Sequence, residues 1–577
     1  MVSYKVSPYV HFIESHLVPN AVQYGVFHQF TGEVLQPDNK LRTWLAEAKL
    51  RNQVLGTKDL KKIAGDQQMS SLISEEFLAP GGYDFLASFA DHYVTRPIQN
   101  PAVAYQSETG VWYLVRISML ERVYSPKPYN LPPIIEEAMS PLIAEVFLAA
   151  DGIKTLGEIF TSACHNSSGT VDHHSFQAAI EFLTDPERQL IKLTRNRTSL
   201  ANPYLPFNTV PRNFYHSSRW QGGEGNSDSI KDFHREGIED ASWEFDIIEP
   251  TMNHALRFPN EVSGGFDYGS RFCLSVLKPE ILSPLDTREA LRVLEVGGGT
   301  GTFALSFIEQ AQRSTTLKYH ILELSPALIE SQTRILSGVQ PKVHHFEQDA
   351  TEFDLSGQRF HLIIANEVVA DFPTAEVHRG QPNEINRHGQ AHDETRFVGE
   401  GAQYVDRYEL RVDDAPDRFL VNAGMFQFIE QAWKHLLPGG TLILSEYGSV
   451  SAFPVRSFHL NHAEFSIHFG HALQCGQKLG FNCRLYTLKE FLSLDDSVPV
   501  LSGREEHIRC LNHVLEQHGM SLPFAIISER KFNEHFQSLV QRIQLTGFSF
   551  SPLSNNFYYG PNINDFMVLS MNKPLDK

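Results

Sequence analysis

A carboxylate and a row of glycines follow one another in the middle of the chain. The apolar segment 293–296 includes Glu295, and glycines then stand at 297, 299 and 301. The apolar run 303–308 has a helix-like composition, so the stretch predicts a strand, a tight turn and a helix. Glycine lets a ligand approach the backbone closely and tolerates positive φ. The pattern favours a ligand with a positive group, because a carboxylate before the turn repels a pyrophosphate.

Two further acidic residues stand at the ends of the next apolar segments. Segment 319–324 contains Glu323 near its end, where an acidic residue would hold ribose hydroxyls. Asp349 follows segment 343–347 and would accept the exocyclic amine of an adenine, although it also fits an ordinary turn residue. These acidic residues predict a nucleoside site beside the turn.

The turn resembles motif I of class I methyltransferases that use S-adenosyl-L-methionine (SAM). Glu295 would attract the amino group of SAM, with Gly297, Gly299 and Gly301 forming the cradle. The alternative is an ordinary strand, turn and helix of an α/β protein. The resemblance implies a Rossmann-like core with a mostly parallel, seven-stranded sheet.

A second group of polar residues follows the apolar segment 360–365. Asn366, Glu367 and Asp371 come directly after it, at the sheet edge where ligands bind in open α/β folds. If the segment coils into a helical turn, Glu367 and Asp371 both face the reacting methyl group. Carboxylates suit a cationic acceptor such as a guanidinium. We expect Glu367 to grip the acceptor nitrogen and Asp371 to support it, unless Asp371 simply caps a turn before Pro373.

The order of motifs over about residues 290–490 resembles the MidA family of protein arginine methyltransferases, whose mitochondrial members assist assembly of respiratory complex I. Its basis is Asn366-Glu367, Asp371 and Pro373, followed by the segments 426–437, 438–444, 446–448 and 462–465. The resemblance implies SAM as cofactor, Asn366 on the cofactor side, and His462 as an acceptor-side ligand or base. Position 464 is Glu where the family usually has Asp, and the family's N-terminal Tyr-Gly-Tyr-Tyr-like run is missing, which leaves the methyl acceptor open.

The remaining chain predicts additional domains. We expect an N-terminal helical region over 1–100, a winged-helix module similar to PqqD over 101–196, a linker and helical lid over 197–285, the methyltransferase domain over 286–500, and a C-terminal extension over 501–577. The winged-helix prediction is based on strand-like pairs, a helix from Pro141, a helix capped by Thr155, a helix over 176–183 and a strand over 190–193. Such a module could recognise a peptide by strand addition or mediate dimerisation.

Composition limits the classes of function. The formal net charge of −19 argues against nucleic acid as a partner. Five cysteines without a Cys-x-x-Cys pair fit a reducing cytosol, and no apolar stretch approaches the ~20 residues of a membrane span, so we expect a cytoplasmic protein without membrane contact. No spaced ligand set predicts a metal. The acceptor is a protein, a peptide or a small molecule such as a natural product, and a non-catalytic SAM-binding assembly factor is the further alternative.

Overall fold

The computed structural model describes residues 3–18, 21–81, 83–96, 102–117, 134–166, 171–195, 251–282, 289–355, 357–380, 397–459, 462–502, 505–522, 525–554 and 563–575. The chain divides into two compact units. Unit 1 comprises Met1–Gly223, Ser502–Leu522 and Phe532–Ser549, and unit 2 comprises Glu224–Leu501, Pro523–Lys531 and Phe550–Lys577. The glycine-rich turn belongs to unit 2.

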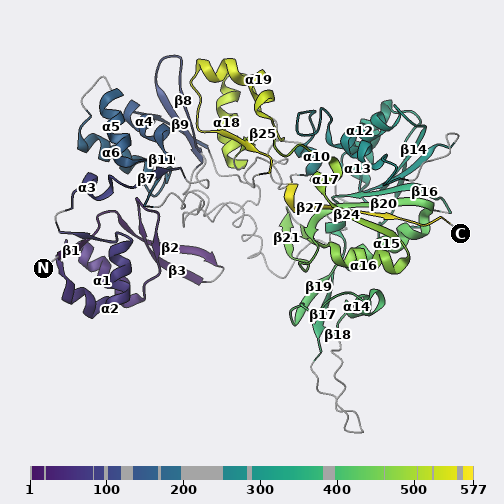
Figure 1. Cartoon of the computed structure of the whole chain (residues 1–577), viewed down its shortest axis with the longest axis horizontal. Helices are drawn as coiled ribbons and strands as arrows, with labels where there is room; N and C mark the ends of the chain where they lie inside the picture. The colour runs from purple at the N-terminus through teal and green to yellow at the C-terminus, as the bar shows by residue number, and fades with distance from the viewer. Residues whose placement is uncertain are drawn as a thin grey trace, which may run out of the picture. The chain divides into compact units, whose positions relative to one another are not determined.

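A mixed sheet lies at the centre of unit 2 (Figure 1). Its order is β15-β14-β13-β16-β20-β27-β24, and the short β23 also pairs with β20. The strands are β13 (Leu291–Val296), β14 (Leu317–Glu323), β15 (His344–Glu347), β16 (Phe360–Asn366), β20 (Leu436–Ser449), β23 (Ile467–His468), β24 (Asn482–Thr487) and β27 (Phe566–Asn572). The pairs among β13, β14, β15, β16 and β20 are parallel, whereas β27 is antiparallel to β20 and β24. The predicted mostly parallel sheet is therefore present.

The strand order reverses at β13, whose neighbours are β14 and β16. Such a switch point opens a crevice at the carboxyl ends of the strands. Helices α12 (Thr302–Ala311) and α13 (Pro326–Ile335) cover one face of the sheet, and α15 (Ala423–His435) and α16 (Phe469–Leu479) cover the other (Figure 1). Helix α11 (Tyr268–Val276) packs in the same core as α12. Alternate residues of β13 enter two different cores, with Val293 in the first and Leu294 in the second. The glycine turn thus leaves a strand that is buried on both faces.

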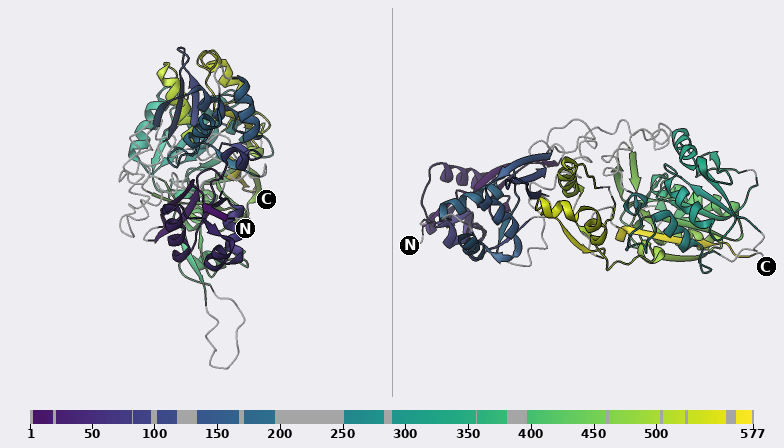
Figure 2. Two further views of the ribbon diagram at one scale, coloured as in Figure 1. Left: turned by 90° about the vertical axis from the view of Figure 1, so that its left-hand side faces the viewer. Right: turned by 90° about the horizontal axis from the view of Figure 1, so that it is seen from above.

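Strand β27 comes from the region that the sequence assigns to a C-terminal extension. It pairs in register with both neighbours, with Leu569 opposite Leu444 on β20 and Leu485 on β24. Val568 and Leu569 are fully buried, one in each core. The sheet therefore extends past the predicted boundary at residue 500, and Figure 2 shows this yellow strand among the green ones.

Unit 2 contains further elements among the described residues. They are α10 (Met252–Ala255), β17 (Ala375–Arg379), β18 (Phe397–Val398), α14 (Ala402–Tyr408), β19 (Arg418–Val421), β21 (Arg456–His459), β22 (His462–Phe465), α17 (Leu488–Leu492), and three 3₁₀ helices, η3 (Leu336–Gly338), η4 (Val369–Asp371) and η5 (Ile563–Asp565). Of the predicted linker and lid, residues 197–250 lie outside the described residues.

Unit 1 contains strands as well as helices. Its first part holds β1 (Ser3–Val6), β2 (Val10–Val18), β3 (Ala21–His28), β4 (Val34–Leu35), α1 (Asn39–Leu50), β5 (Leu55–Gly56), α2 (Thr57–Ser74), β6 (Leu78–Pro80), α3 (Phe85–Phe89) and β7 (Tyr93–Thr95). Its second part holds β8 (Ala102–Gln106), β9 (Trp112–Ile117), β10 (Ile134–Met139), α4 (Pro141–Ala149), β11 (Asp151–Thr155), α5 (Leu156–Asn166), α6 (His173–Thr184) and β12 (Lys192–Thr194). Helix α4 begins at Pro141 as predicted, and the Thr155 hydroxyl accepts the Glu158 N–H at 3.2 Å, which forms the predicted cap. Beyond β25 (Pro499–Ser502), the later chain holds α18 (Glu505–Gln517), α19 (Glu529–Arg542) and β26 (Ser549–Pro552).

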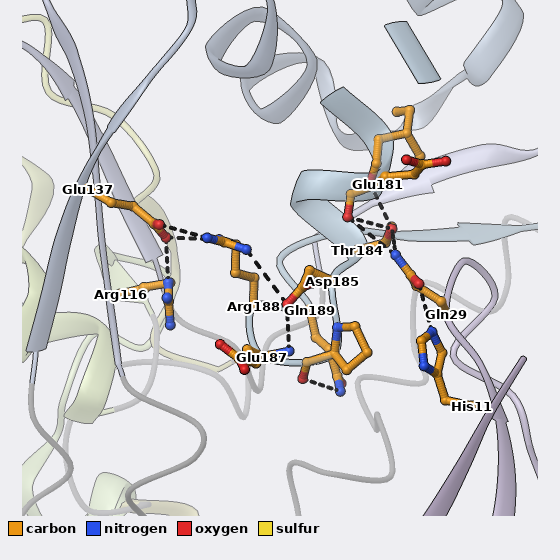
Figure 3. Close-up of polar contacts among 12 residues, drawn as sticks. His11, Gln29, Arg116, Glu137, Glu181, Thr184, Asp185, Glu187, Arg188 and Gln189 are labelled. Carbon is orange, nitrogen blue, oxygen red and sulfur yellow. Dashed lines mark hydrogen bonds and ion pairs between the residues drawn. The ribbon is translucent and has the colours of Figure 1, made fainter. Parts of the chain in front are cut away.

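A polar network joins the two parts of unit 1 at the end of α6 (Figure 3). Glu137 on β10 accepts the Arg116 Nε–H at 2.7 Å and two N–H groups of Arg188 at 3.1 and 2.9 Å. On the other side, Gln29 donates to the Thr184 hydroxyl at 3.2 Å. Because Arg116 is 6% exposed, Glu137 compensates a buried charge.

Candidate functional site

The predicted glycine turn adopts positive φ angles, which favour glycine. Gly297, Gly299 and Gly301 have φ of 68°, 50° and 95°, and Gly301 precedes the first residue of α12. A Cβ on Gly297 would come within 2.5 Å of the Val368 side chain, whereas a Cβ on Gly299 would meet no atom within 4 Å. The turn is therefore packed at Gly297 and open at Gly299, where a ligand can approach the backbone.

Glu295 lies near the end of β13, two residues before Gly297. Its side chain is 2% exposed, and the Tyr319 hydroxyl donates to its Oε2 at 3.1 Å. Burial raises the pKa of Glu295 to about 8, and the nearby charge of Glu323 adds to the rise while the Tyr319 bond opposes it. The buried carboxyl group of Glu295 therefore loses its proton more easily when a cation lies beside it.

Glu323 is held in place at the end of β14. Its Oε1 accepts the N–H groups of Leu324 and Ser325 at 2.8 and 3.0 Å, and its Oε2 accepts the Gln332 amide at 3.0 Å. The same Gln332 nitrogen donates to the Gly299 carbonyl at 2.9 Å. Gln332, which the sequence did not single out, thus ties the second acidic strand end to the glycine turn.

Asp349 lies in the turn after β15. Its Oδ1 accepts both the N–H and the hydroxyl of Thr351, at 2.8 and 2.7 Å. These are the contacts of a turn-forming aspartate. The Gln348 N–H donates to the Glu323 carbonyl at 3.2 Å, so Asp349 is anchored close to the end of β14. Its role with adenine stays a prediction.

Asn366 ends β16, and Glu367 follows it beside the glycine turn. Glu367 has φ of 53°, so it does not belong to a right-handed helical turn, and the only helical residues that follow in this described loop are those of η4. Both Glu367 oxygens accept the Met252 N–H, at 3.0 and 2.9 Å, and Oε1 also accepts the Asn366 amide at 3.3 Å. Burial raises the pKa of Glu367 to about 7, and Glu464 contributes to the rise.

Two more glutamates lie near Glu367, and together the three form what we call the acidic edge (Glu367, Glu446 and Glu464). Glu446 on β20 is 2% exposed and accepts the N–H groups of Ala370 and Tyr447 at 3.2 and 2.9 Å. Burial, followed by the charge of Glu367 and then that of Glu464, raises the pKa of Glu446 well above its ordinary value. Glu464 belongs to β22. The sequence placed both glutamates in family motifs without assigning them a role.

For two predicted acceptor-side residues, Asp371 and His462, the structure describes the backbone position but gives no contact that tests their role. Asp371 ends η4, and its N–H donates to the Val368 carbonyl at 3.3 Å, so it takes part in the turn before Pro373. His462 begins β22, two residues before Glu464, but its side chain lies outside the described residues. The catalytic roles of Asp371 and His462 therefore stay predictions.

Residues 277–468 match a protein-family model described as "Putative S-adenosyl-L-methionine-dependent methyltransferase". A search of curated proteins gives no match. Among solved structures, an uncharacterized protein from Burkholderia thailandensis is 16% identical with a TM-score of 0.33, covering 61% of this chain and 93% of its own. A superfamily member from the same organism, bound to S-adenosyl-homocysteine, is 15% identical with a TM-score of 0.31 and the same coverages. The glycopeptide N-methyltransferase MtfA in complex with SAM is 13% identical with a TM-score of 0.22, covering 39% of this chain and 90% of its own.

The residues present fit SAM. The turn is open at Gly299, Glu295 offers a carboxylate for an amino group, and Glu323 lies where ribose hydroxyls bind in such folds. Within the described ranges, no helix is long and apolar enough to cross a membrane, and no group of His, Cys, Asp or Glu is arranged to hold a metal ion. The segment that carries the turn and most of the crevice is thus similar to SAM-dependent methyltransferases, and the cofactor of the domain is S-adenosyl-L-methionine.

Proposed function

We propose that this domain transfers a methyl group from SAM to a nitrogen of a cationic protein or peptide side chain, with arginine as the preferred acceptor. Bound SAM supplies the electrophilic methyl group. Glu295, Glu323 and Asp349, with the glycine turn, hold the cofactor in this proposal. The acidic edge receives the acceptor.

The acidic edge is the observation that carries the proposal. The charge of Glu464 opposes ionisation of Glu367, and the charges of Glu367 and Glu464 oppose ionisation of Glu446. Burying like charges together is unfavourable unless a cation enters. A guanidinium offers a planar set of donors and a permanent positive charge that match several carboxylates at once. The edge therefore favours a cationic acceptor over a neutral one.

Glu367 is suited to the transfer step itself. A nitrogen that gains a methyl group must lose a proton, and a base is most effective when its pKa lies near the working pH. The pKa of Glu367, raised to about 7, meets this condition. We assign Glu367 to orienting the acceptor nitrogen and taking its proton, while Glu446 and Glu464 balance the positive charge. Activity should therefore fall as the pH drops below about 7.

The test combines cofactor titration with transfer of tritiated methyl groups into a lysate of the host. We expect micromolar SAM binding, label in a protein band, and methylated arginine after acid hydrolysis of that band. Glu367→Gln should keep SAM binding and lose at least about a hundredfold in transfer rate. Glu309→Gln makes the same charge change at an exposed position of α12 and should leave both unchanged.

The other outcomes identify the alternatives. Label only in small molecules would replace the protein acceptor with a metabolite. Binding without any label would indicate a SAM-binding assembly factor, and full activity of Glu367→Gln would remove Glu367 from the reaction.

A further inference from the structure

A buried tyrosine reaches the acidic edge from a distant part of the chain. Tyr268 is the first residue of α11, where Asp267 caps the helix by accepting the Ser270 N–H at 2.8 Å. The Tyr268 side chain is 0% exposed, and its hydroxyl donates to the Asn366 Oδ1 at 2.6 Å. This hydrogen bond lies one residue before Glu367.

The Tyr268 contact decides which way the Asn366 amide faces. An asparagine amide has an oxygen that only accepts and a nitrogen that only donates. Because Oδ1 takes the Tyr268 hydroxyl, Nδ2 must face the other way, and it donates to the Glu367 Oε1 at 3.3 Å. The three side chains form a chain of donors that ends on the carboxylate.

We propose that Tyr268 is a positioning residue for the acceptor carboxylate, because its hydroxyl fixes the Asn366 amide with the nitrogen toward Glu367. This inference rests on the proposed function for the role of Glu367 in catalysis, but the hydrogen-bond chain itself does not. Without the hydroxyl, the amide is free to turn its oxygen toward Glu367. That orientation repels an ionised carboxylate and accepts a hydrogen bond from a protonated one.

The groups around Glu367 determine how strongly the orientation of the Asn366 amide affects its ionisation. The charged groups near it are Glu464 on β22, which opposes its ionisation, and Glu446 on β20, whose own ionisation the charge of Glu367 opposes. Helix α10 contributes only backbone N–H groups, those of Met252 and Asn253. Asp371 follows on the same loop as a further acid. Tyr268 stays protonated and remains a donor, because burial and then the charge of Glu367 raise its pKa well above the ordinary value. Among the described residues, the Asn366 amide is therefore the side-chain donor to Glu367.

The experiment measures the pKa of Glu367 directly, without an acceptor. Full-length protein labelled with carbon-13 at the glutamate carboxyl is titrated by NMR, and the Glu367 signal is assigned by its loss in Glu367→Gln. In Tyr268→Phe we expect the pKa of Glu367 to rise by about one unit, which is about a tenfold change in its ionisation constant. Tyr319→Phe is the matched control, since it also removes a buried tyrosine hydroxyl that donates to a carboxylate, in that case Glu295. It should move the pKa of Glu295 and leave that of Glu367 unchanged.

A second variant separates positioning from general loosening of the fold. Asn366→Leu removes the amide and should also raise the pKa of Glu367, and adding Tyr268→Phe to Asn366→Leu should cause no further rise, because no amide is left to turn. In the tritium assay on host lysate, the loss of transfer in Tyr268→Phe should be about sixfold larger at pH 6.5 than at pH 8.5. An unchanged pKa of Glu367 in folded Tyr268→Phe, or additive rises in the double variant, would overturn the inference. Failure of the proposed function has a different signature, since Glu367→Gln would then remain active whatever its pKa in the wild type.

Discussion

We expect Glu295→Gln to stabilise unit 2 while weakening its binding of SAM. The pKa of Glu295 is raised to about 8 from an ordinary 4.5, so the folded domain retains a proton that the unfolded chain releases. Its contribution to the free energy of unfolding is therefore intact below pH 4.5 and falls by about 1.4 kcal/mol per pH unit up to about pH 8. At pH 7 the loss is about 3 kcal/mol, which sets the upper limit of the gain in the variant.

The same carboxylate should make SAM binding release protons. An ammonium group beside a carboxylate lowers its pKa by about 1 to 3 units. Starting from a pKa of about 8, binding at pH 7 should therefore release between about 0.4 and about 0.9 proton. Affinity should rise with pH between 6 and 7.5, a range in which the amino group of SAM is still mostly charged.

Two assays check this pair of effects. Urea unfolding at pH 4.5 and pH 7 measures stability, with the variant gaining at pH 7 only. Calorimetry in buffers of different ionisation enthalpy counts the protons, and Glu295→Gln should release none and bind more weakly. A variant that is no more stable than the wild type at pH 7, or a wild type that binds SAM without proton release, would refute the reasoning.

Two further predictions concern stability. Glu137→Gln should destabilise unit 1 by about 2 to 4 kcal/mol, because it leaves the buried Arg116 without its counter-charge. This difference from the wild type should become smaller in acid, because the pKa of Glu137 is lowered by Arg188 and Arg116 and the wild-type carboxylate is lost only as the pH falls through that pKa. Chemical unfolding of the full chain at two pH values measures the difference. Gly297→Ala should lower the melting temperature more than Gly299→Ala, because both positions have positive φ but only the first Cβ collides with Val368. The second change should instead act mainly on SAM affinity in calorimetry, and equal melting temperatures would count against the packing argument.

The cofactor side of the site could be predicted because its signals are local. Glu295 and the three glycines lie within seven consecutive residues, and the end of each buried strand is marked by a change from apolar to polar residues. Parallel strands then bring their carboxyl ends to one edge, so the relative placement of Glu295 and Glu323 follows from the fold.

The acceptor side could be predicted only in part. Glu367 was found because it directly follows a strand, but its left-handed backbone differs from the helical turn expected there. Tyr268 and Met252 are 98 and 115 residues away from their partners, and no local pattern links residues so far apart. The role of Gln332 was missed for another reason, since one glutamine on an amphipathic helix looks like any solvated position.

The place of β27 in the sheet has a consequence for how the protein is made. Strand β24 contacts the sheet through β27, yet β27 begins at Phe566, long after β24 ends at Thr487. During synthesis at about 5 to 20 residues per second, the interval between the two strands lasts on the order of 4 to 16 s. Throughout that time residues 441–447 of β20 lack β27 as the partner for their backbone N–H and C=O groups, a condition that favours pairing with other chains. Expression of this protein should therefore depend on the supply of chaperones that shield sheet edges on the ribosome.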